Sequence, residues 1–150
     1  MTLIAHRGNL TGPNPDRENS PDYIDEAIAQ RFSVEVDLWK IDDELYLGHD
    51  DTQYKVSLEW IKQRQEHLWI HCKNSWALDS MLKNNLHCFW HDTDDYTMTS
   101  KNYVWTYPGK PIVGYMSICV LPERHINIFT DKLPQCFGVC SDYVMNIRNL

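Results

Sequence analysis

The stretch SVEVDL at residues 33–38 decides the fold. Its apolar residues and its two acids alternate with a period of two, which is typical of a β-strand. Glu35 and Asp37 therefore point to the same side of the strand. Two like charges on one inward face are costly unless a positive charge joins them, and a hard cation such as Mg²⁺ or Ca²⁺ suits carboxylate oxygens. A solvated sheet face is the plain alternative for such a pair.

Strands and helices alternate on both sides of this stretch. Ser20 and Pro21 are typical of an N-cap and a first helical position, so a helix is predicted to begin there. The next predicted elements are a strand at residues 45–47, a helix at 57–65, a strand at 68–72 and a helix from residue 75. This alternation predicts βαβ units and parallel strands.

The second half of the chain has strands joined by links that are too short for full helices. The predicted strands lie at residues 87–90, 103–106, 112–120 and 137–144, with one helix predicted at 124–133. No repeat or linker divides the chain, so we expect residues 1–150 to form one domain. A complete (β/α)₈ barrel needs roughly 250 residues, so a full outer ring of helices is excluded.

The composition limits the partners and the compartment. With 21 acidic and 14 basic side chains the net charge is −7, which argues against a general nucleic-acid binder. The sequence has no apolar run long enough to span a membrane and no secretion signal, so we expect a cytoplasmic protein without stable membrane insertion. Five cysteines without a C-x-x-C pair indicate reduced thiols; Cys136 and Cys140 as half of a metal site are the alternative.

Polar residues follow the ends of successive predicted strands, at the edge where parallel α/β sheets bind ligands. In chain order they are His6 and Arg7, Glu35 and Asp37, His49, His71 and Lys73, and then His91 and Asp92. Each pair alone has a structural interpretation, but their ordered recurrence favours a site. We interpret Glu18, His91 and Asp92 as supporting or surface residues, and Asp142 as a structural residue that closes the last strand.

Five short motifs resemble those of the glycerophosphodiester phosphodiesterase family, whose members are TIM barrels related to phosphatidylinositol-specific phospholipases C. They are IAHRG at residues 4–8, ENS at 18–20, EVD at 35–37, GHD at 48–50 and GVCSDY at 138–143. The resemblance is dense over residues 3–50 and thin over residues 75–136. It implies a compact, truncated TIM-type (β/α) barrel with reduced helices in its second half.

The resemblance implies metal-dependent hydrolysis of a phosphodiester, in particular a glycerophosphodiester. The products would be an alcohol and a phosphomonoester such as glycerol 3-phosphate, so the partner would be a small-molecule substrate. The roles it implies are His6 and His49 as acid and base, Arg7 and Lys73 as phosphate ligands, and Glu35 and Asp37 as metal ligands. Imidazoles titrate near neutral pH and can fill both proton-transfer roles.

The third main strand departs from the family pattern. The family has Glu-x-Lys or Asp-x-Lys there and uses the carboxylate as a third metal ligand, whereas this chain has His71-Cys72-Lys73. Imidazole suits Mg²⁺ or Ca²⁺ less well, so His71 would favour Mn²⁺ or Zn²⁺, or Asp92 or Glu18 would replace it. This departure leaves a non-catalytic relative that binds a phosphate ligand or a protein as the alternative function. A homodimer that covers exposed barrel wall is a further alternative.

Overall fold

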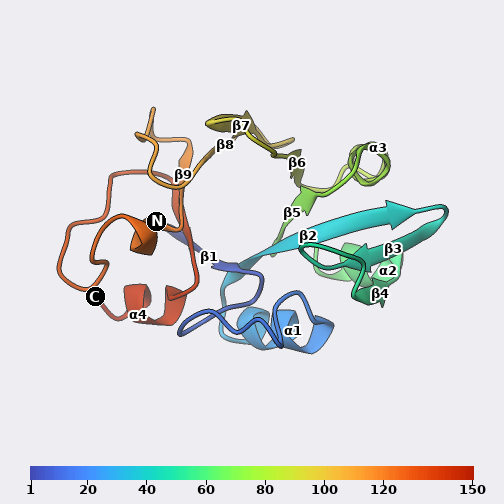
Figure 1. The fold of residues 1–150 in the computed structure, drawn as a ribbon, viewed down its shortest axis with the longest axis horizontal. Coiled ribbons are helices and arrows are strands. Elements are labelled where there is room, and N and C mark those ends of the chain that lie inside the picture. The colour runs from blue at the N-terminus through green and yellow to red at the C-terminus, as the bar shows by residue number, and fades with distance from the viewer.

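The computed structural model describes residues 1–150 as a mixed α/β fold around one curled sheet (Figure 1). The parallel strands are β1 (Thr2–His6), β2 (Ser33–Ile41), β5 (Leu68–Cys72), β6 (Cys88–Trp90), β8 (Val104–Thr106), β9 (Ser117–Val120) and β10 (Gly138–Ser141). The antiparallel strands are β3 (Glu44–Leu47), β4 (Tyr54–Val56) and β7 (Tyr96–Met98). The helices are α1 (Pro21–Ala29), α2 (Leu58–Gln63), α3 (Ser75–Lys83), the 3₁₀ turn η1 (Pro122–Arg124) and α4 (Val144–Arg148).

The parallel strands follow one another around the sheet in the order β6-β5-β2-β1-β10-β9-β8. β7 pairs with β8 and also lies beside β6, so the two ends of the sheet meet and the strands form a ring in Figure 1. Hydrogen bonds rather than a strand ladder join these ends. Thr97 Oγ1 donates to the Trp90 carbonyl and Ser100 N donates to the Cys88 carbonyl, both at 2.8 Å.

The predicted alternation is confirmed in β2. The apolar side chains at 34, 36 and 38 are buried in an outer core together with residues of α1 and α3. Glu35 and Asp37 lie on the opposite face, inside the curl, and are also buried. The interior holds a second apolar cluster that includes Ile4, Trp69, Phe89, Trp105 and Ile118.

The strand register brings the predicted site residues together. His6 pairs with Glu35 across β1 and β2, and Asp37 pairs with His71 across β2 and β5. His6 and His71 lie at or next to the C-terminal ends of β1 and β5, and the register places Glu35 and Asp37 of the longer strand β2 beside them. The four side chains therefore gather at one edge of the parallel part of the sheet. The sequence pattern predicted the strands, and the parallel pairing sets which residues are neighbours.

The predicted helix at residues 124–133 is wrong. Only η1 is helical there, and the residues after it form turns. Phe129 N donates to Asn127 Oδ1 at 3.1 Å, and Asn127 N donates to Asp131 Oδ2 at 2.8 Å. These local side-chain acceptors compete with helical hydrogen bonds, which is why Asn and Asp disfavour helix interiors.

Two predicted strands of the second half are too long, and three elements are missing from the prediction. Residues 112–116 lie outside β9, because Ser117 N closes a turn on the Gly114 carbonyl. β10 ends at Ser141, whose Oγ accepts a hydrogen bond from Tyr143 N, and Val144 begins α4. The short elements β4, β7 and α4 were not predicted.

Helices are few after β6, as expected. α4 is the only α-helix in that part of the chain, and the links between its strands are loops and turns. None of the helices has the length and apolar character needed to cross a membrane.

Candidate metal and phosphate site

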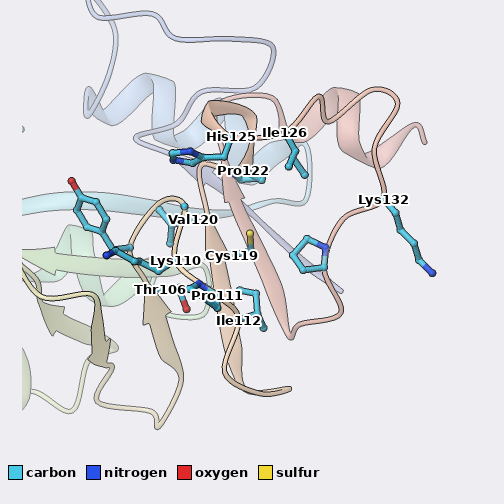
Figure 2. Close-up of a pocket in the computed structure, with 13 residues that line it drawn as sticks. Thr106, Lys110, Pro111, Ile112, Cys119, Val120, Pro122, His125, Ile126 and Lys132 are labelled. Carbon is cyan, nitrogen blue, oxygen red and sulfur yellow. The ribbon is translucent and has the colours of Figure 1, made fainter.

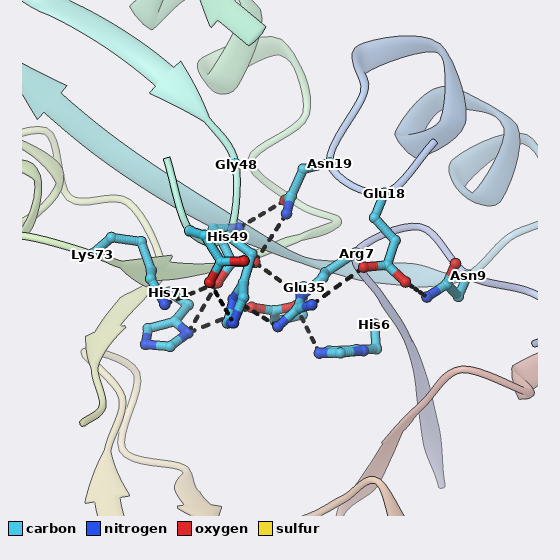
Figure 3. Close-up of polar contacts among 12 residues, drawn as sticks. His6, Arg7, Asn9, Glu18, Asn19, Glu35, Gly48, His49, His71 and Lys73 are labelled. Carbon is cyan, nitrogen blue, oxygen red and sulfur yellow. Dashed lines mark hydrogen bonds and ion pairs between the residues drawn. The ribbon is translucent and has the colours of Figure 1, made fainter. Parts of the chain in front are cut away.

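A cavity of about 350 Å³ opens at the C-terminal ends of the parallel strands. The predicted site residues that line it are His6, Arg7, Glu35, His49, His71 and Lys73. Asp37 has no exposed surface and contacts several of them. Figure 3 shows the side chains of Arg7, Glu35, His49 and His71 gathered at this place. The structure therefore brings every predicted site residue to one place. The cavity wall continues through residues that the sequence pattern did not assign to the site, among them His91, Tyr107 and Arg124.

Glu35, Asp37 and His71 form the one group of side chains arranged to hold a metal ion. Their ligand atoms all lie within 4.8 Å of one another. Glu35 Oε2 and Asp37 Oδ1 are buried and have no hydrogen-bond partner. Burial and the neighbouring Asp37 raise the pKa of Glu35 above its ordinary value. A buried acid pair with unpartnered oxygens fits a divalent cation, so these residues suit the predicted metal.

The His71 ring is fixed by a backbone carbonyl. Its Nε2 lies 2.9 Å from the carbonyl oxygen of His91, which can only accept, so Nε2 carries a proton. Its Nδ1 then faces Asp37 Oδ1 at 3.3 Å and Glu35 Oε1 at 3.7 Å. A lone pair aimed at two carboxylates is repulsive, so Nδ1 either holds a proton or meets a cation shared with the acids. Metal-binding histidines are typically held in this way through the other ring nitrogen.

Asp37 is the most contacted residue of the site. Arg7 Nε lies 3.0 Å from its Oδ2, and Lys73 Nζ lies 3.7 Å from its Oδ1. Asn19 Nδ2 donates to Oδ2 at 2.9 Å, while Asn19 Oδ1 accepts from the Asp37 backbone N–H at 2.9 Å. Burial acts to raise the pKa of Asp37, but the contact with His71 and the charge of Arg7 hold it well below its ordinary value. Asp37 is therefore ionised and rigidly oriented.

Asn19 was missed as a site residue, although it stands in the ENS motif. It has a positive φ of 63°, in the left-handed region that asparagine tolerates better than most residues. In this conformation the Asn19 side chain both donates to the Asp37 carboxylate and accepts from the Asp37 backbone N–H. An asparagine between an acid and a helix start is the sequence signal that could have identified it.

His6 is held by a carboxylate from the other end of the chain. Its Nδ1 lies 2.7 Å from Asp142 Oδ1, and its Nε2 lies 4.0 Å from Glu35 Oε2. Burial acts to lower the pKa of His6, but the hydrogen bond to Asp142 and the charge of Glu35 outweigh it, so the pKa is raised. Asp142, expected to be a structural residue, thus also orients His6. Asn9 Nδ2 donates a hydrogen bond to the same Asp142 oxygen at 2.8 Å.

Arg7 links three parts of the site. Besides its ion pair with Asp37, Nη1 donates to Glu18 Oε2 at 3.2 Å, and Nη2 donates to His49 Nδ1 at 2.7 Å. Because His49 Nδ1 accepts this hydrogen bond, Nε2 carries the proton of the neutral ring. The His49 side chain is 41% exposed, whereas the Lys73 side chain is only 16% exposed. His49 is thus the open member of the group, and Arg7 is already bound by protein groups.

The other candidates for a metal ligand do not join the acid pair. Glu18 binds Arg7 and Asn9, and Asp92 lines the cavity outside the group of ligand atoms. All five cysteines are free thiols, as expected, and neither Cys136 nor Cys140 belongs to a metal-ligating group. His71 is therefore the third ligand that the geometry favours.

A second cavity of about 350 Å³ lies over β8 and β9, between residues 106–112 and 119–134 (Figure 2). Its lining is largely apolar and contains no acid. Thr106 is buried there, and its hydroxyl has no hydrogen-bond partner. This cavity contains none of the clustered polar groups that mark the first one.

The chain matches no protein-family model, no curated protein and no solved structure. Its motifs and the geometry of its site are therefore the features that point to a function.

Proposed function

We propose that this protein is a metal-dependent phosphodiesterase on a compact TIM-type barrel, similar to glycerophosphodiester phosphodiesterases. The observation that carries the proposal is the grouping of Glu35, Asp37 and His71 at the same cavity as the carboxylate-bound His6. Phosphodiester hydrolysis requires a metal ion or other positive charge at the phosphate and groups that transfer protons. The acid pair can bind the metal ion, the cationic side chains add positive charge, and the oriented imidazoles can transfer protons.

Glu35, Asp37 and His71 would hold the metal ion. When bound, a divalent ion polarises the phosphoryl oxygens and stabilises the charge that develops on them. Two carboxylates and one imidazole form a softer ligand set than three carboxylates, so Mn²⁺ or Zn²⁺ suits this site better than Mg²⁺ or Ca²⁺. The His91 carbonyl keeps the His71 ring turned toward the acids.

His6 acts as the general base. Asp142 accepts a hydrogen bond from Nδ1, so the neutral ring presents the lone pair of Nε2 to the cavity and can take a proton from the attacking water molecule. His49 is the partner imidazole and donates a proton from Nε2 to the leaving oxygen. Because Arg7 donates to His49 Nδ1, the proton on the neutral His49 ring faces away from Arg7.

Lys73 and Arg7 supply positive charge for the phosphate. Lys73 lies beside Asp37, and Arg7 lies between Glu18, Asp37 and His49. A bound phosphate would compete with these protein groups for the Arg7 guanidinium, whose planar set of N–H donors suits phosphate oxygens. The substrate would be a small phosphodiester such as a glycerophosphodiester, and the products would be an alcohol and a phosphomonoester.

Hydrolysis assays test this function. Glycerophosphocholine and bis(p-nitrophenyl) phosphate are incubated with the protein and Mn²⁺, Zn²⁺, Mg²⁺ or Ca²⁺, with a chelator as the blank. We expect turnover that needs a metal and that is lost in His6→Ala and His49→Ala. If neither substrate is hydrolysed with any of these metal ions, the proposal is contradicted.

A non-catalytic phosphate-binding or protein-binding relative is the second candidate. The observation that favours it is that Arg7 is bound by protein partners and that a histidine replaces the third carboxylate. Metal binding without turnover across a broad substrate panel would support this candidate. The carboxylate-held His6 favours the enzyme instead, because ligand binding alone does not require an oriented base.

A further inference from the structure

The loop after β6 brings another imidazole, that of His91, to the wall of the site cavity. Its side chain is only 10% exposed, and its Nδ1 lies 3.0 Å from Asp94 Oδ2. The other carboxylate oxygen of Asp94 accepts a hydrogen bond from Asp92 N at 3.0 Å. Burial acts to raise the pKa of Asp94, but these hydrogen bonds hold it below its ordinary value. Asp94 is therefore an ionised acceptor, and Nδ1 of His91 carries a proton.

The other ring nitrogen of His91 is free. A neutral imidazole with its proton on Nδ1 presents a lone pair at Nε2, and no protein group hydrogen-bonds that atom. Because His91 lines the cavity and Nε2 is not one of the fully buried polar atoms, this lone pair is open to a hydrogen-bond donor that enters the cavity. The proposed mechanism uses only the main-chain carbonyl of His91, so the ring remains unexplained.

The His91 ring is a neighbour of His71, which belongs to the metal-binding group. Its centroid is 6.0 Å from that of His71 and 5.6 Å from that of Tyr107. A phosphate bound to a metal ion at Glu35, Asp37 and His71 would therefore have His91 and Tyr107 within reach of one of its ester arms. His6 lies on the β1 side of the cavity, three strands around the sheet from β6, so the two imidazoles would meet different parts of a bound phosphodiester.

We propose that His91 recognises a hydroxyl group of the alcohol on the substrate phosphate, by accepting its hydrogen bond at Nε2. Asp94 is a positioning residue that keeps the lone pair of His91 in the cavity. This inference rests on the proposed function for the place of the phosphate, and it adds the residue that selects phosphodiesters with a free hydroxyl on one ester arm. An alkyl chain or a quaternary ammonium group offers no donor to Nε2.

Binding of two matched phosphates tests the inference. Glycerol 3-phosphate and n-propyl phosphate share the phosphate and a three-carbon chain, and they differ in the hydroxyl groups. Calorimetry in saturating Mn²⁺ should show that the wild-type protein binds glycerol 3-phosphate about threefold to tenfold more tightly, the worth of one hydrogen bond. His91→Phe should remove this preference while the affinity for n-propyl phosphate stays unchanged.

Further variants separate recognition from folding. His91→Gln keeps an acceptor and should retain part of the preference, and Asp94→Asn should weaken it. His67→Phe, at an exposed histidine outside the cavity, is the matched control and should leave both affinities unchanged. The unchanged affinity for n-propyl phosphate shows that each variant is folded and that its phosphate site is intact.

The outcomes separate this inference from the proposed function. Equal binding of the two phosphates by the wild type, a preference that survives His91→Phe, or no binding of either one would overturn the role of His91. A preference that depends on His91, in a protein that hydrolyses no phosphodiester, would support the inference and contradict the proposed function. With glyceryl and n-propyl p-nitrophenyl phosphates, the ratio of kcat/KM should follow the binding preference.

Discussion

Nδ1 of His6 lies 2.7 Å from Oδ1 of Asp142, although 136 positions separate the two residues in the chain. The contact arises because β1 and β10 are parallel neighbours, with Ala5 opposite Ser141 in their register. The first and last strands thus jointly build the base of the proposed reaction. A histidine with its Nδ1 proton fixed by a carboxylate presents Nε2 as an acceptor, which is the form a general base needs.

Asp142→Asn should therefore lower turnover and leave the metal site intact. We expect a loss of about 10²- to 10⁴-fold in kcat, the usual contribution of an oriented proton-transfer group. Steady-state hydrolysis measures the loss, and calorimetric Mn²⁺ binding should stay within about twofold of the wild type. Asp79→Asn, on the outer helix α3, is the control. Equal kcat in the Asp142→Asn variant and the wild type would remove His6 orientation from the mechanism.

Glu35→Gln should have opposite effects on the metal-free and the metal-bound protein. The substitution removes one of two buried like charges, so in chelator the free energy of unfolding should rise by about 1–3 kcal/mol. The wild type should gain about 2.7 kcal/mol at a Mn²⁺ concentration of about 100 times Kd, and the variant should lose most of that gain. Urea unfolding with and without Mn²⁺ measures both. Equal Mn²⁺ stabilisation in the two proteins would contradict the assignment of Glu35 as a ligand.

His71→Glu should change which metal the protein prefers. A third carboxylate makes the ligand set harder, so the ratio of Mg²⁺ or Ca²⁺ affinity to Zn²⁺ affinity should rise about tenfold or more. Calorimetric titrations of each ion give the ratio. His125→Glu, outside the site cavity, provides the control for added charge. An unchanged ratio would show that His71 does not contact the ion.

Ser100→Ala should loosen the junction between the two ends of the curled sheet. Ser100 Oγ accepts from Cys88 N at 3.0 Å and donates to the Leu86 carbonyl at 3.2 Å. Its loss leaves a buried backbone N–H without this partner, which costs about 1–3 kcal/mol of stability. Thermal unfolding measures the cost, and amide exchange at Cys88 should speed up. Unchanged exchange at Cys88 would mean that other contacts hold this junction.

The local features of the fold were predictable from sequence. The alternation at 33–38 predicts β2 and the common side of Glu35 and Asp37, and Ser57 predicts the cap of α2, where its Oγ accepts from Trp60 N at 3.0 Å. Strand register then follows from parallel pairing. The motif order located His6, Glu35 and Asp37 because the register of β1 and β2 brings them to the same edge of the parallel strands.

Features that depend on distant segments were not predictable in the same way. The hydrogen bond of His6 to Asp142 needs the closing contact of the first and last strands, which no local pattern specifies. The position of His91 in the cavity depends on a loop whose shape is set by Asp94. The helix expected at 124–133 fails because Asn127 offers a local acceptor, and periodicity alone does not reveal this competition.

The most direct test compares Mn²⁺ binding with Mn²⁺-dependent hydrolysis on one protein sample. Calorimetry gives the Kd for Mn²⁺, and a titration of glycerophosphodiester hydrolysis gives the Mn²⁺ concentration at half-maximal rate. We expect the two midpoints to agree, both to be lost in Asp37→Asn, and only the hydrolysis to be lost in His6→Ala. A rate that does not respond to Mn²⁺, or one that His6→Ala leaves unchanged, would contradict a metal-dependent phosphodiesterase at this site.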